Sequence, residues 1–197
     1  MTLLVFAMLF VQLTQAGFTD PRDNHTYGVV RIAGVEWMTE NLRTALPNSW
    51  CPQDDPKLCD SMGRLYPWEE AVRACPAGWR LSSERDWQAL EGHLGMSAAE
   101  IENERLRGAA GAVGDQLKEN GAAKLAFPFA GWRRPDGTFA VGNGKDRAAA
   151  IWTSTVATPG RAWHRDLSSV RSGIWRSPVE FSYALSARCV RDATADQ

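Results

Sequence analysis

The chain has 197 residues, of which 44% are hydrophobic, so it can enclose a core and has the usual size of one domain. Its formal net charge of -1 at pH 7 provides no broad attraction for phosphate backbones or anionic lipid surfaces. Nucleic acid is therefore not an expected partner.

The first sixteen residues have the pattern of an export signal. An uncharged run from Leu3 to Leu13 is too short to span a bilayer, and Ala16 follows it before the chain turns polar. We expect residues 1–16 to be a signal peptide cleaved after Ala16, residues 17–192 to form a single domain, and residues 193–197 to be a flexible tail. The mature protein is then secreted, periplasmic or at the cell surface, without a transmembrane helix. No Lys or Arg precedes the apolar run, so a truncated start and a buried first strand are the alternative interpretations.

The mature domain is predicted to open with a β-hairpin. Residues 27–32 alternate imperfectly between apolar and polar types, residues 33–34 suit a tight turn, and residues 35–38 supply the second strand. Residues 44–62 contain three prolines and are predicted to be irregular. The acidic residues of this segment are expected to be solvated, because the sequence lacks the spaced acidic loop of a calcium site.

Four cysteines, Cys51, Cys59, Cys75 and Cys189, are expected to form disulfides if the chain is exported to an oxidising compartment. Four cysteines allow three connectivities. The short loop favours Cys51 with Cys59, which leaves Cys75 to pair with Cys189 across most of the domain. A zinc site is the weaker alternative, because the spacing lacks paired C-x2-C motifs and no histidine lies beside the cysteines. We therefore expect no metal or cofactor.

Helices are predicted in the middle of the chain. The first begins at Pro67 and ends before Pro76, and its spacing places one apolar stripe toward the core. The residues of that stripe are Trp68, Ala71, Val72 and Cys75. A second helix follows Ser83, which forms a capping box with Asp86, and a weaker third helix is predicted from Ser97. Glycines at positions 108 to 121 then indicate loops around a short turn at residues 115–118.

The remaining sequence is predicted to be rich in β-structure, because short apolar runs alternate with turn residues. Candidate strands cover residues 151–155, 162–167, 174–176 and 181–190, and the middle two are expected to form a hairpin. The last strand would return Cys189 to Cys75 and so close the helices onto a C-terminal sheet.

Several sequence blocks occur in the order of a known family. They are Val35-Glu-Trp-Met-Thr-Glu-Asn-Leu, Gly63-Arg-Leu-Tyr-Pro-Trp-Glu-Glu-Ala, Ala74-Cys-Pro-Ala-Gly-Trp-Arg-Leu-Ser and Arg188-Cys-Val-Arg-Asp. With these blocks the chain resembles the Fibrobacter succinogenes major paralogous domain over nearly the whole mature sequence. It departs from the pattern at Ser82, where Pro is expected, and in the Ala-rich residues 108–123.

The resemblance implies an α+β fold similar to the C-type-lectin-like architecture of formylglycine-generating enzymes. Two main N-terminal helices would pack on a twisted, mostly antiparallel sheet with long loops. It also implies a bacterial surface or secreted protein without an established biochemical activity. The enzymes' chemistry does not carry over, because they use two neighbouring cysteines near the C-terminus and Cys189 stands alone there. The Glu-Pro-Asn triplet with which many lectins bind calcium and sugar is absent as well.

Nine tryptophans are the most unusual feature of the composition. Trp37, Trp68, Trp79 and Trp87 lie on faces that the periodicity turns inward, so we expect them in the core. Other tryptophans stand beside arginine or histidine in the β-rich half, where rings and hydrogen-bond donors suit a sugar or another planar ligand. The candidate ligand-binding residues are Trp132, Arg133, Trp163, His164, Arg165 and Trp175. The alternative is structural, with arginines stacked on tryptophan faces of the strands.

His164 and Asp166 lie two residues apart and therefore on the same face of an ideal strand. No nucleophile motif accompanies them, so catalysis is not expected. The sequence favours a secreted or cell-surface binding or adhesion domain without enzymatic activity, with carbohydrate as the candidate ligand. One alternative is a structural cell-envelope module that binds protein partners. Another is an enzyme on the formylglycine-generating-enzyme-like fold.

Overall fold

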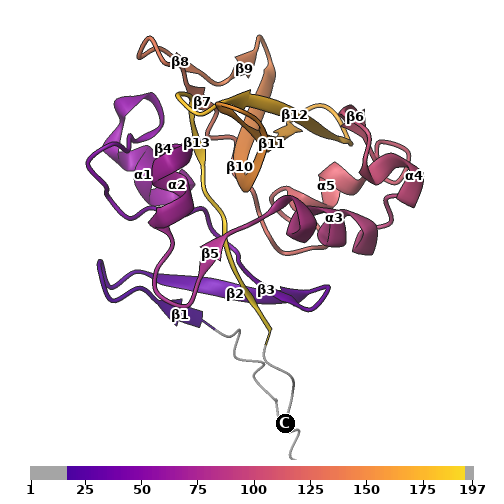
Figure 1. The fold of residues 1–197 in the computed structure, drawn as a ribbon, viewed down its shortest axis with the longest axis horizontal. Coiled ribbons are helices and arrows are strands. Elements are labelled where there is room, and N and C mark those ends of the chain that lie inside the picture. Colours follow the sequence, from indigo (N-terminus) through magenta and orange to yellow (C-terminus); the bar gives the residue numbers. More distant parts are fainter. Residues whose placement is uncertain (1–16, 194–197) are drawn as a thin grey trace, which may run out of the picture.

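The structure is a computed structural model that describes residues 17–193. These residues form an α+β fold in which two sheets are joined by the last part of the chain and flanked by short helices (Figure 1). The predicted signal peptide, residues 1–16, lies outside the described residues, as do residues 194–197 of the predicted tail.

The smaller sheet has five strands and contains the predicted hairpin. In spatial order its strands are β1 (Gly17–Thr19), β2 (Thr26–Ile32), β3 (Val35–Met38), β14 (Cys189–Asp192) and β5 (Arg80–Leu81). Ala33 and Gly34 connect β2 to β3 with φ angles of 52° and 78°. Two successive left-handed residues match the twist of a two-residue hairpin, so the predicted turn is confirmed.

The larger sheet has nine strands and is mostly antiparallel. Its main order is β6 (Arg105–Arg107), β12 (Ile174–Glu180), β11 (Arg161–Ser168), β10 (Asp146–Thr158), β13 (Ala184–Ser186), β7 (Trp132–Arg133) and β8 (Phe139–Ala140). Strand β4 (Leu65–Pro67) pairs with β13, and β9 (Gly142–Asn143) pairs with β10. The predicted hairpin of the middle two strands is confirmed as β11 and β12.

The single strand predicted over residues 181–190 is wrong, because the chain forms two strands there in different sheets. Strand β13 lies in the larger sheet and β14 in the smaller one. Between them, Arg188 turns inward and donates hydrogen bonds to the carbonyls of Met38 and Leu125 at 2.9 and 2.8 Å. Alternation along this segment indicates extended structure but not a change of sheet.

Five α-helices and one 3-10 helix occur in residues 17–193. They are η1 (Pro52–Asp54), α1 (Pro56–Met62), α2 (Trp68–Ala74), α3 (Glu84–His93), α4 (Ala98–Ile101) and α5 (Val113–Leu117). Helices α2 and α3 occur at the two main predicted positions, and the capping box of Ser83 with Asp86 is confirmed. Two details are corrected. Residues 44–62 contain α1, which Asp55 caps, and Val72 is 42% exposed because α2 turns Ala71 and Ala74 inward.

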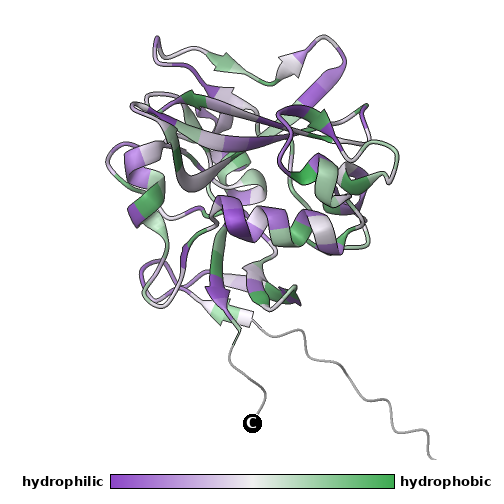
Figure 2. Ribbon diagram, turned by 45° about the vertical axis from the view of Figure 1, so that its right-hand side comes forward, coloured by the Kyte–Doolittle hydropathy of each residue, from purple (hydrophilic) through white to green (hydrophobic). Residues whose placement is uncertain are grey.

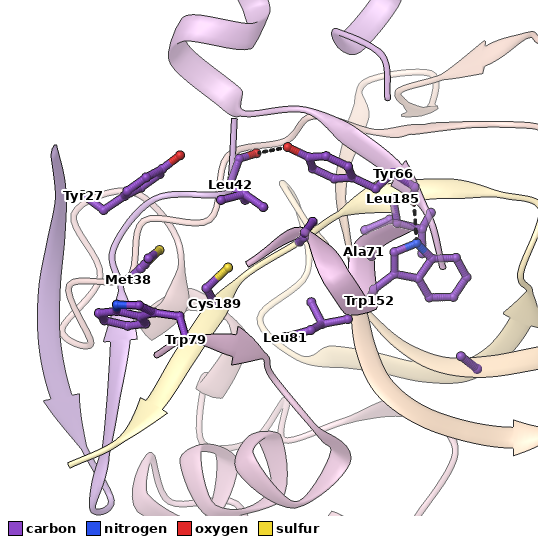
Figure 3. Packing of buried hydrophobic residues seen from close by; sticks show 14 of the residues in the cluster. Tyr27, Met38, Leu42, Tyr66, Ala71, Trp79, Leu81, Trp152, Leu185 and Cys189 are labelled. Carbon is purple, nitrogen blue, oxygen red and sulfur yellow. Dashed lines mark hydrogen bonds between the residues drawn. The ribbon is translucent and has the colours of Figure 1, made fainter. Parts of the chain in front are cut away.

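Alternation along the strands distributes their side chains between two large hydrophobic cores, and a small third cluster contains Leu65, Ala130 and Ala184. One core lies between the sheets and α2, and Figure 3 shows Cys189 there among Met38, Trp79 and Leu81. The other core lies against α3 and α5 and contains Trp37, Trp87 and Ile151. Both sheets contribute to both cores. The close view also shows Tyr66 donating to the carbonyl of Leu42, at 3.3 Å (Figure 3).

Both predicted disulfides are present. Cys51 pairs with Cys59 across a separation of 8 residues, and Cys75 pairs with Cys189 across 114 residues. Closing these loops restricts the unfolded chain, which stabilises the fold by roughly 2 to 3 kcal/mol for the short loop and 4 to 5 kcal/mol for the long one. All four cysteines of the chain are therefore paired.

Candidate functional site

Strands β10, β11 and β12 place neighbouring residues on opposite faces of the larger sheet, because successive side chains of a strand alternate. Asp166 lies opposite Ala150 on β10 and opposite Trp175 on β12. Arg165, the preceding residue, lies opposite Arg176. We call the face that carries Asp166 the groove face, and the face that carries Arg165 and packs against α3 the helix face.

The groove face is hollowed at two adjoining places. A hollow of about 220 Å³ has Trp132, Asp166 and Trp175 in its lining. A second hollow of about 270 Å³ is lined by Trp132 and Asp166 together with His164. Alanines of β10 form part of both linings, which leaves room between the larger side chains. The hollows share these two lining residues and so adjoin, and we call them together the sheet groove.

Hydrogen bonds hold the side chains of the sheet groove in place. His164 contacts the Ser177 carbonyl through Nδ1 at 2.6 Å and the carboxylate of Asp166 through Nε2 at 3.1 Å. The second carboxylate oxygen, Oδ1 of Asp166, is buried without a hydrogen-bond partner. The indole of Trp175 donates to the Ser177 hydroxyl at 3.1 Å. The predicted placement of His164 and Asp166 on one face is confirmed.

The helix face carries a buried cluster of five charged residues. Its members, the arginine–glutamate cluster, are Glu84, Glu91, Arg107, Arg165 and Arg176. Arg165 bonds Glu91 through Nε at 2.7 Å and Glu84 through both terminal nitrogens. Arg107 bonds both oxygens of Glu91 at 2.8 and 2.7 Å. Arg176 completes the cluster with a bond to Glu84 at 2.8 Å.

Opposite charges favour the ionised forms of Glu84 and Arg165 although burial opposes them. Burial raises the pKa of Glu84, but hydrogen bonds and charge attraction from Arg165 and Arg176 outweigh it, so the pKa lies below its ordinary value. Burial lowers the pKa of Arg165, and Glu91 and Glu84 more than offset that effect. The cluster therefore fastens α3 to the sheet through charged hydrogen bonds.

Two of the predicted ligand-binding residues belong to the helix face. Arg165 is 0% exposed and bonded within the arginine–glutamate cluster, so it lies in the core and not on the accessible surface that the sequence predicts. The ring of Trp163 is stacked under the guanidinium of Arg176, with 3.8 Å between the guanidinium carbon and the ring centroid. This pair matches the structural alternative for the tryptophans.

Arg133 also lies away from the sheet groove. Its guanidinium carbon is 4.2 Å from the ring centroid of Trp50, on the side of β7 opposite to Trp132. The structure thus brings three of the six predicted residues together, namely Trp132, His164 and Trp175, and separates the other three.

The sequence did not single out several polar residues that line the sheet groove. Asp146, Arg171 and Tyr183 contribute to the two hollows. They lie on different strands and loops, and their proximity depends on the strand order, which no local pattern specifies. Turn residues around them were the one available signal, because loops beside a rigid sheet often carry binding residues.

Two further classes of site are not found in residues 17–193. No group of three or more His, Cys, Asp or Glu side chains could hold a metal ion in this part of the chain. Within the same residues, no helix combines the length and apolar character needed to cross a membrane.

The protein is therefore an α+β domain with two disulfides and a shallow site on the surface of its larger sheet. The sequence profile of the Fibrobacter succinogenes major domain matches residues 30–191, and the chain belongs to that family. The resemblance inferred from the sequence blocks is therefore confirmed. No curated protein and no solved structure matches the chain.

Proposed function

We propose that this domain is a non-enzymatic binding or adhesion domain outside the cytoplasm, and that carbohydrate binds in the sheet groove. The observation that carries the proposal is the combination of Trp132 and Trp175 with Asp166 in the lining of one hollow. Aromatic faces pack against the apolar faces of sugar rings, and a carboxylate accepts hydrogen bonds from their hydroxyl groups. The C-type-lectin-like architecture implied by the resemblance is part of the same proposal.

Trp163 provides a matched control for the test of this function. Trp163 and Trp175 are both half-buried tryptophans of the larger sheet, but they lie on opposite faces. Affinity electrophoresis in gels containing neutral glucans, xylan, mannan or pectin would compare Trp175→Ala with Trp163→Ala. Because stacking buries aromatic surface, we expect Trp175→Ala to weaken binding roughly tenfold to a hundredfold. Trp163→Ala should bind like the unaltered protein.

Two results would contradict the carbohydrate proposal. One is unchanged mobility of the folded protein with every polysaccharide. The other is equal loss of binding in both variants, which would indicate damage to the fold and not removal of a contact. Urea unfolding of each variant supplies the check that the protein is folded.

A second candidate function, binding of a cell-envelope protein, is favoured by exposed apolar side chains near the sheet groove. Leu106, in the lining, is 44% exposed, and Val141 and Val170, on adjoining loops, are 38% and 65% exposed. The segment carrying β8 is coloured as hydrophobic at the upper edge of the molecule (Figure 2). A stoichiometric partner recovered from the producing cells and lost in Leu106→Ser would favour this function.

The enzyme alternative has less support. An enzyme that uses a thiol needs a free cysteine, and all four cysteines are paired in this structure. Alkylation of a cysteine without reductant, together with turnover that depends on it, would revive that alternative.

A further inference from the structure

The hydrogen bonds around His164 fix the number of protons in the sheet groove. Both ring nitrogens face oxygens, namely the Ser177 carbonyl at 2.6 Å and the Asp166 carboxylate at 3.1 Å. A carbonyl oxygen only accepts, so Nδ1 must donate its proton to it. A neutral imidazole has no second N–H, and its Nε2 lone pair would then face a carboxylate lone pair.

We propose that the His164 ring carries a proton on both nitrogens and forms an imidazolium–carboxylate pair with Asp166. This pair holds the carboxylate of Asp166 in position as the anchor of the sheet groove, the residue that binds the ligand's polar group. His164 is the positioning residue, and Asp166 accepts a hydrogen bond from a ligand hydroxyl. The inference rests on the proposed function. Beyond that function, the inference names Asp166 as the residue that binds the ligand's polar group and specifies the protonation state of the His164–Asp166 pair.

The position of Asp166 supports its role as the anchor. Asp166 lies in the lining of both hollows, and its side chain is 28% exposed, so the groove gives access to it. Oδ2 is engaged by His164, whereas Oδ1 has no partner in the fold. Because Oδ1 is buried, a ligand hydroxyl would instead bond Oδ2, which has a second lone pair beside the one that accepts from His164.

Other charged and titratable groups near His164 do not replace this pairing. Arg134, directly after β7, and Tyr183, directly before β13, line the same hollow. The positive charge of Arg134 disfavours a positive charge on the His164 ring, whereas the negative charge of Asp166 on β11 favours it. From β10 and β12 the ring meets the neutral indole of Trp152, at 6.4 Å between ring centroids, and the Ser177 carbonyl. Asp166 is therefore the acceptor that stabilises the second proton.

Loss of the proton would disturb the anchor. When Nε2–H is removed, two acceptors face each other across 3.1 Å, and the carboxylate is expected to turn away. Binding through Asp166 should therefore weaken when the pair loses this proton at higher pH. Acidic conditions favour the bound state of the groove, and alkaline conditions oppose it.

The proton count can be tested without any ligand. In the full chain labelled with ¹⁵N-histidine, the signals of His164 are assigned by their loss in His164→Gln. We expect both ring nitrogens of His164 to carry protons at pH 6, and Asp166→Asn to leave one, since an amide N–H can donate to Nε2. A neutral ring at pH 6 in the unaltered protein would overturn the two-proton pair.

The anchor is tested by repeating the polysaccharide gels between about pH 5 and pH 9. We expect the affinity of the unaltered protein to fall about tenfold across this range, whereas that of Asp166→Asn changes little, because its pair with a neutral imidazole persists. An equal pH profile in both proteins would overturn the anchor. Failure of every polysaccharide at every pH would refute carbohydrate binding, and the anchor with it, while the nitrogen signals still decide the proton count.

Discussion

His164 and Arg165 are neighbours on β11, yet their side chains enter very different surroundings. Arg165 points to the helix face, where it is 0% exposed and bonded to two glutamates of α3. His164 points to the groove face, where its carboxylate partner keeps 28% of its side chain exposed. One face uses charge to join two elements of the fold. The other leaves charge where a ligand can reach it.

The difference between the faces shows why charged aromatic motifs in strands are ambiguous. Burial removes water from charged groups, so the helix face keeps them only because every carboxylate has at least one arginine partner. On the groove face, Asp166 keeps 28% of its side chain exposed and lies in the lining of both hollows. Access from a hollow is thus a better sign of a ligand site than charge itself.

The largest effect is expected from Glu91→Ala on the helix face. Glu91 is 0% exposed and bonds both Arg107 and Arg165, so its removal leaves two buried arginines short of a partner. We expect the free energy of unfolding to fall by about 3 to 5 kcal/mol. Urea unfolding measures it, and Glu119→Ala, at an exposed position, serves as the control. A loss equal to that of the control would show that the cluster does not fasten α3.

Local patterns predicted much of the fold. The turn at Ala33-Gly34 and the capping box of Ser83 depend on neighbouring residues and were predicted correctly. The passage of residues 181–190 from one sheet to the other was not, because both strands have the same extended pattern. Helix α1 was missed, although Asp55 before Pro56 is a cap followed by a suitable first helical residue.

The candidate site was predicted only in part, for a related reason. Strand alternation placed His164 with Asp166, but Arg165 was predicted as a ligand-binding residue beside them, because alternation does not tell which face a helix will cover. That choice depends on Glu91 and Glu84, which lie 74 and 81 residues before Arg165 in the sequence. The position of Trp132 also depends on residues distant in the sequence, because β7, which carries it, pairs with β13.

A smaller effect is expected from Glu84→Gln, which keeps the shape of the side chain and removes its charge. Glu84 bonds Arg165 and Arg176, and hydrogen bonds to charged groups are the stronger kind, so we expect a loss of about 2 kcal/mol at pH 7. Urea unfolding at pH 7 measures this loss.

The pH dependence of stability distinguishes the charge of Glu84 from its shape. The pKa of Glu84 is below its ordinary value in the folded state, because hydrogen bonds and attraction from Arg165 and Arg176 outweigh burial. Its contribution is therefore complete above the ordinary value of about 4.3 and is lost as the pH falls from there toward the folded value. The unaltered protein should lose more stability than Glu84→Gln between about pH 5 and pH 3. Parallel profiles would contradict the role of this charge.

The smallest effect on stability is expected from Asp166→Asn on the groove face. Asp166 is partly exposed, and the amide that replaces its carboxylate can still hydrogen-bond His164, so no buried group loses its partner. We expect the free energy of unfolding at pH 7 to change by less than about 1 kcal/mol, since partly solvated ion pairs contribute little. If the loss instead approached that of Glu91→Ala, the groove face would be a second structural face, and Asp166 would no longer be a residue held ready for a ligand.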